Sequence, residues 1–152
     1  MSLEDLVGIN EALRQARKSY DEGGVPIGSV LMQGPDLIAS GHNQRVQKGD
    51  PIAHGEMDCL RAAGRRKSYA NTTLFTTLSP CMMCAGTIVQ FKIPRVVIGE
   101  ARTFGGNEQF LRDHGVSVEI LNDERCIELM SRFIREKPDL WNEDIAGEQA
   151  TC

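Results

Sequence analysis

The sequence contains no apolar run that approaches the roughly 20 residues needed for a membrane-spanning helix. Its first ten residues, MSLEDLVGIN, are acidic at the positions where a secretory signal would be basic. Neither feature fits a membrane protein or a secreted protein. The expectation is a cytoplasmic protein without a membrane partner.

The sequence also lacks a long run of consecutive basic residues. Seventeen Lys and Arg residues face 21 Asp and Glu residues, and the formal net charge is −4. Because proteins that bind long nucleic acids usually carry a basic surface, this balance argues against such a partner. The chain also lacks repeats, low-complexity tracts and linkers. Its 152 residues, 41% of them hydrophobic, suffice for one core, so residues 1–152 are predicted to form a single domain.

Helices and strands are predicted to alternate along the chain. Apolar residues recur at steps of three and four from Leu3 to Tyr20, which predicts an amphipathic helix that two glycines end. Helices are also expected over 53–64, 80–91 and 123–137, strands over 26–32, 37–41, 72–77, 95–100 and 116–121, a loop over 41–51, and a short tail of one or two helical turns after 138. Alternation favours a largely parallel sheet, and the opening hairpin makes it mixed. The predicted fold class is α/β, a three-layer α/β/α sandwich with a mixed five-stranded sheet.

Three residues have the chemistry of zinc ligands. His54 lies in AHGEMDCL, and Cys81 and Cys84 lie in SPCMMCAG. Zinc prefers neutral imidazole and thiolate among side chains. Both cysteines are predicted on one turn of a helix that Pro80 opens, and the N–H groups of a helix start favour thiolate. Three ligands leave a position for water, as in catalytic zinc sites, so one Zn²⁺ per subunit is predicted.

The remaining cysteines and histidines are not at ligand spacing. Cys59 and Cys126 are predicted to lie in the core and Cys152 ends the chain, while His42 and His114 lie in a loop and a turn. An odd count of five cysteines without a secretory signal fits reduced thiols or metal ligation better than a disulfide framework.

Glu56, two residues after His54, is the candidate catalytic residue. Zinc lowers the pKa of a bound water to about 7, and a carboxylate outside the coordination sphere can take the proton and deliver it to a substrate. Alone, each motif has an ordinary interpretation, because His54 could simply begin a helix and Glu56 could be a favourable first-turn charge. In this order, with Pro80 directly before Cys81, they match the zinc deaminase pattern H-x-E…P-C-x-x-C.

Longer stretches carry a more specific resemblance. EGGVPIGSVL, GHNQRVQKG, TTLFTTLSPCMMC, IPRVVIGE and DLWNEDI together resemble the fungal (yeast-type) cytosine deaminases of the zinc-dependent cytidine deaminase superfamily, from about Ala12 to Glu148. The resemblance implies a cytidine deaminase-like fold, a homodimer, and hydrolysis of the small-molecule nucleobase cytosine to uracil and ammonia. It implies zinc ligation by His54, Cys81 and Cys84, and proton transfer by Glu56 to N3 of the ring and to the leaving amino group.

The same resemblance implies a substrate pocket. Asn43 and the backbone at Gly55 would bind the edge of the base, the backbone carbonyl of Ser79 would lie near the departing ammonia, Asp144 would contact the amino group, and Phe104 and Trp141 would flank the ring. Each has an ordinary alternative: a turn residue for Asn43, a solvated charge for Asp144, and core packing for the two aromatic residues.

One departure bears on the substrate. The fungal pattern has an acidic residue between the two cysteines where this chain has Met82. Other deaminase substrates therefore stay open, namely isocytosine, guanine or a pterin, and less favourably the adenosine of a tRNA. The alternative outside enzymes is a zinc-stabilised binding module, which should have a fourth protein ligand and no use for Glu56.

Overall fold

The computed structural model describes residues 1–147. Twelve elements follow one another along the chain: α1 (Leu3–Asp21), β1 (Gly28–Gln33), β2 (Asp36–His42), α2 (Arg45–Lys48), α3 (Gly55–Ala63), β3 (Thr73–Leu78), α4 (Met82–Gln90), β4 (Arg95–Glu100), α5 (Glu108–Asp113), β5 (Ser117–Ile120), α6 (Glu124–Glu136) and α7 (Pro138–Asp144). Cys152 lies outside the described residues, and the extent of the domain over 1–152 stays a prediction.

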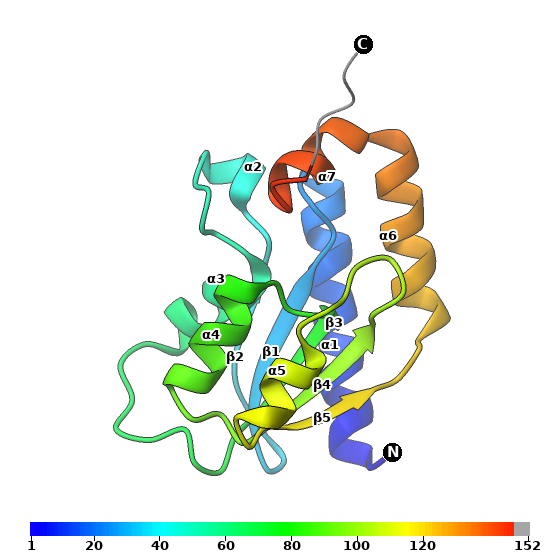
Figure 1. Ribbon diagram of the computed structural model, residues 1–152. Coiled ribbons are helices and arrows are strands. Elements are labelled where there is room, and N and C mark those ends of the chain that lie inside the picture. The colour runs from blue at the N-terminus through cyan, green and yellow to red at the C-terminus, as the bar shows by residue number, and fades with distance from the viewer. Residues whose placement is uncertain (148–152) are drawn as a thin grey trace.

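The five strands form one sheet in the order β2-β1-β3-β4-β5. β1 is antiparallel to both β2 and β3, and β3, β4 and β5 are parallel. Figure 1 shows α1 and α6 behind the sheet and α3, α4 and α5 in front of it. The predicted three-layer sandwich with a mixed sheet is confirmed.

Each face of the sheet has its own apolar cluster. Ile9 and Ala12 of α1 pack with Phe75 and Val97 behind the sheet. The larger cluster in front joins the sheet to α3, α4 and α5. The predicted apolar stripe of the first helix is partly wrong at its start, because Leu6 is 43% exposed. No helix within residues 1–147 has the length and apolar character needed to cross a bilayer.

The short helices differ most from the sequence prediction. α2 lies inside the stretch predicted as a loop, and α5 was not predicted. The tail from residue 138 forms the seven-residue helix α7, about two turns, as predicted. α3 and α4 each begin two residues later than predicted, because His54 and Cys81 have extended backbone and act as the N-caps. This displacement places a metal-ligand candidate at the very start of each helix.

A buried ion pair fixes the start of α1 to the sheet. Arg95 at the start of β4 binds both oxygens of Asp5 at 2.7 and 2.8 Å, and Asp5 is only 6% exposed. The hydrogen bonds from Arg95 hold the pKa of Asp5 below its usual value of 3.8.

Arg95→Met is expected to destabilise the fold at pH 7 by about 1–3 kcal/mol, because it leaves a buried carboxylate without its partner. A carboxylate with a lowered pKa stabilises the fold above its unfolded pKa and loses this effect as pH falls through the folded pKa. The difference from the parent should therefore shrink below about pH 4. Urea unfolding at pH 7 and pH 3 measures it. Arg14→Met, which removes an exposed ion pair with Glu11, should change little at either pH.

Candidate metal centre and catalytic site

Two helix starts meet at the metal-ligand candidates. His54 is the N-cap of α3, Cys81 is the N-cap of α4, and Cys84 lies in the first turn of α4. Their ligand atoms lie within 4.8 Å of one another, and these three residues form the only such group of His, Cys, Asp and Glu found in residues 1–147. The juxtaposition predicted from the sequence is confirmed.

The spacing of the three atoms fits zinc. His54 Nδ1 lies 3.5 Å from the sulfur of Cys81 and 3.8 Å from that of Cys84. Zn–S bonds of about 2.3 Å and Zn–N bonds of about 2.0 Å at tetrahedral angles give an N···S edge of about 3.5 Å. One nitrogen and two sulfurs, already at this separation, make a donor set that zinc prefers.

The surroundings shift the pKa values of the three ligand candidates in different directions. A hydrogen bond from the Cys84 thiol, helped by His54, lowers the pKa of Cys81 to about 4. Burial acts to lower the pKa of His54, but the Cys81 sulfur and the Asp144 carboxylate raise it to about 9. The pKa of Cys84 is raised, because its proton is held by Cys81 and its site is buried. Since metal ligands must be deprotonated, zinc binding here releases protons from His54 and Cys84.

Glu56 lies in the first turn of α3 beside this group. Its side chain is 4% exposed and lines the same cavity as His54 and Cys81. Burial raises the pKa of Glu56, and the negative charge of Cys81 adds to the effect. A carboxyl group whose pKa is raised holds a proton more readily than an exposed carboxylate, which suits it to acid and base roles.

The cavity beside the metal-ligand candidates is small. Its volume is about 20 Å³, room for one ordered water. Its wall combines polar and apolar side chains, namely Ile27, His54, Glu56, Leu78, Ser79, Cys81, Phe104, Trp141, Asp144 and Ile145. Phe104 and Trp141 meet edge to face, with ring centroids 6.0 Å apart. Phe104, Trp141, Ser79 and Asp144 were predicted in the pocket, whereas Ile27, Leu78 and Ile145 gave no sequence signal beyond being apolar.

Asp144 of α7 bridges two other site residues. Its Oδ1 lies 3.2 Å from Nε2 of His54, and its Oδ2 accepts a hydrogen bond from Asn43 Nδ2 at 3.1 Å. A carboxylate at this position fixes the tautomer of the imidazole, so that Nδ1 is free to bind a metal. The sequence gave no sign of this contact, because 90 residues separate His54 from Asp144.

Asp144→Asn should weaken zinc binding by about 10–100-fold, the usual effect of removing a partner that orients a ligand. The asparagine can offer its single oxygen to His54 or to Asn43, but not to both. Zinc affinity measured by competition with a chromogenic chelator tests this. Asp139→Asn, in the first turn of the same helix and exposed, serves as the control. Equal affinities for the parent and both variants would contradict the role of Asp144.

Two predicted substrate-binding residues do not line the cavity. Asn43 is fully buried, and its Oδ1 accepts from the backbone N–H of Arg45 at 3.0 Å, as a turn residue does. Its backbone carbonyl accepts from Ser19 Oγ at 2.7 Å. Gly55 packs so closely that a Cβ there would lie 3.0 Å from the carbonyl oxygen of Ile27. Both residues lie behind the side chains that form the cavity wall. Asn43 contacts that wall through its hydrogen bond to Asp144.

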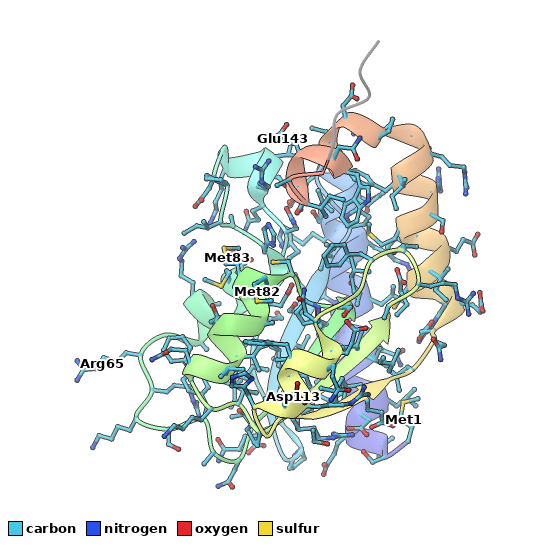
Figure 2. The ribbon with its side chains drawn as sticks, viewed as in Figure 1. Met1, Arg65, Met82, Met83, Asp113 and Glu143 are labelled. Atoms are coloured by element: carbon cyan, nitrogen blue, oxygen red, sulfur yellow. The ribbon has the colours of Figure 1, made fainter. Side chains whose placement is uncertain are left out.

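Met82 lies outside the inner cavity. It is 55% exposed at the start of α4 and lines a larger outer hollow of about 460 Å³ together with Arg45, Met83 and Glu143. Figure 2 shows Met82 and Met83 where α4 begins. The departure from the fungal pattern therefore lies in this outer hollow, whose wall also includes His54, Cys81, Phe104, Asp144 and Ile145 of the inner cavity.

Comparison with known proteins places this geometry in a family. The family model of the cytidine and deoxycytidylate deaminase zinc-binding region matches residues 4–100. The chain belongs to this family. The zinc site and the five-stranded fold of this deaminase domain agree with that membership.

Individual relatives of this deaminase differ in substrate. The chain is similar to a cytosine deaminase of Candida albicans, with 51% identity over 95% of this chain and 99% of the relative. It is also similar to a tRNA-specific adenosine deaminase of Bacillus subtilis, with 34% identity over 88% of this chain and 90% of the relative.

Solved structures share the fold. A tRNA:A34 deaminase studied for A-to-I editing has 27% identity and a TM-score of 0.70, covering 78% of this chain and 99% of that chain. A guanine deaminase from Nitrosomonas europaea has 20% identity and a TM-score of 0.70, covering 87% and 84% respectively. At this identity the second likeness concerns the fold alone.

Proposed function

We propose that this deaminase hydrolyses free cytosine to uracil and ammonia. The observation that carries the chemistry is a three-ligand group of His54, Cys81 and Cys84 with a buried glutamate in the same cavity. The relative that is 51% identical over nearly the whole chain supports cytosine as the base. The tRNA-specific relatives are less similar, and the net charge of −4 does not favour an RNA partner.

His54, Cys81 and Cys84 would hold zinc, which when bound lowers the pKa of a water to about 7 and supplies the nucleophile. Glu56 would pass one proton of that water to N3 of the ring, where it remains in uracil, and would pass the second proton of the water to the amino group, which departs as ammonia. Asp144 holds His54 and faces the amino group, while the Ser79 carbonyl lies beside it. Phe104 and Trp141 enclose the ring, and the hydrogen bond from Asn43 holds Asp144 in place. The reaction consumes one water and releases one ammonia.

Ammonia release from a panel of bases tests this function. The zinc-loaded protein is incubated with cytosine, isocytosine, guanine, adenine and a pterin, with cytidine as the control. Cytosine should be turned over and cytidine should not. The cavity of about 20 Å³ must already widen to admit a free base, and the added ribose would need still more room beside Phe104 and Trp141. Turnover of another base alone would support the deamination but show a different substrate. If none of the bases released ammonia, a free-base deaminase would be contradicted.

The proposal includes a homodimer. The exposed face of α4 supports it, since Met82 is 55% exposed and, one turn further on, a Cβ at Gly86 would have no heavy atom of the described chain within 4 Å. A second copy packed there would cover the apolar side chain of Met82, which water now reaches. Light scattering that gives the mass of a single chain would contradict the dimer. A cytoplasmic location stays a prediction.

A further inference from the structure

The loop between β4 and α5, residues 101–107, is tied to the turn that carries Cys81. One oxygen of Glu108, Oε2, accepts hydrogen bonds from Ser79 Oγ at 2.8 Å and from the backbone N–H groups of Gly106 and Asn107 at 2.8 and 2.9 Å. Asn107 Nδ2 donates to the carbonyl of Pro80 at 3.0 Å. Ser79 and Pro80, the two residues before Cys81, are therefore held by Glu108 at the start of α5 and by Asn107 at the end of the loop.

The sequence of this loop suits the arrangement. Gly106 has φ +122°, which side-chain-bearing residues rarely adopt, and a Cβ at Gly105 would lie 2.9 Å from the carbonyl oxygen of Ala101. The two glycines let the backbone turn tightly enough for its N–H groups to converge on one carboxylate. Phe104, just before them, is thereby kept at its edge-to-face contact with Trp141.

The carboxylate is held in its charged form. Burial acts to raise the pKa of Glu108, but the hydrogen bonds from Ser79 and the loop amides lower it below its usual value. Hydrogen bonds to a charged acceptor are roughly twice as strong as neutral ones. The link between the loop and Ser79 is accordingly stronger than an ordinary loop contact.

We propose that Glu108 is a positioning residue for the deamination: it holds Ser79, and with it the turn to Cys81, at the wall of the cavity. This inference rests on the proposed function, because Ser79 matters only if its carbonyl faces the reacting amino group. Glu108 itself touches no substrate, since it is absent from the cavity wall.

Glu108→Ala should lower kcat/KM for cytosine, measured per bound zinc, by about 10–100-fold, the scale of effect when a group at the reaction is displaced by about 1 Å. Glu108→Gln keeps an oxygen that accepts the same N–H groups and should restore part of the loss. Gln109→Ala, on the exposed neighbouring residue of α5, is the control and should behave as the parent. A purely structural role would lower the melting temperature but leave kcat/KM per zinc unchanged.

Ser79→Ala keeps the backbone carbonyl and removes the hydroxyl that Glu108 binds. The double variant should behave like Glu108→Ala alone, because Ser79→Ala removes a contact that Glu108→Ala has already broken. Full additivity, or unchanged kcat/KM in Glu108→Ala while the parent is active, would overturn the inference.

Hydrogen exchange separates this inference from the proposed function. Glu108→Ala should speed exchange at the N–H groups of Ser79, Cys81 and Gly106, whatever base the protein accepts. If the parent turns over no base and exchange at Ser79 and Cys81 is nevertheless faster in the variant, the proposed function fails and the positioning contact stands. If exchange there is unchanged, the positioning role fails on its own.

Discussion

Glu56→Gln is expected to lower kcat for cytosine by at least about a thousandfold, within the range that general acid and base groups contribute. Glutamine has nearly the same shape as glutamate but cannot take or release a proton. Its side chain would stay in the cavity, where Glu56 is 4% exposed. Because Glu56 is not one of the three ligand candidates, zinc content should equal that of the parent.

Three measurements decide the role of Glu56: steady-state ammonia release, zinc per chain, and the thermal unfolding midpoint. Glu4→Gln, an exposed glutamate in the first turn of α1, is the matched control. An active Glu56→Gln variant would remove the proton-transfer assignment. A variant that is inactive because it has lost its zinc would show instead that Glu56 supports the metal.

Much of the fold could be predicted because its signals are local. The three- and four-residue apolar spacing of α1 matches the observed Leu3–Asp21. Asp123, the first residue of the helix predicted over 123–137, caps α6 and accepts from the N–H of Arg125 at 2.9 Å. The zinc-site motif could be predicted for a related reason. His54, Cys81 and Cys84 each belong to a short pattern, and alternating strands and helices bring two helix starts to the same edge of the sheet.

The rest depends on contacts between distant residues. α5 has only six residues and no side-chain cap at Asn107, so its own sequence signals little. Its position depends on the hydrogen bond between Glu108 and Ser79, which are 29 residues apart. The same holds for Asp144, whose contact with His54 was missed although the residue was predicted in the pocket. Propensity and periodicity describe single segments, and neither reports which segments meet.

Cys84→Ala is expected to lose at least about a thousandfold in zinc affinity, since partners that only orient a ligand are already worth about 10–100-fold. Deaminase activity should fall with the zinc content. Cys59→Ala is the matched control, because both cysteines are fully buried in helices on the same face of the sheet. Cys59 donates a weak hydrogen bond to the carbonyl of Ala39 and is not one of the three ligand candidates.

The comparison of these two variants separates metal binding from packing. Cys59→Ala should lose about 1 kcal/mol of stability, a typical effect of a core substitution, and retain its zinc and activity. Cys84→Ala should lose both, and added zinc should not restore them at concentrations that saturate the parent. If the two variants behaved alike, the sulfur of Cys84 would be a packing group. A zinc-stabilised binding module predicts a different result. Its fourth protein ligand would let Cys84→Ala retain part of its zinc.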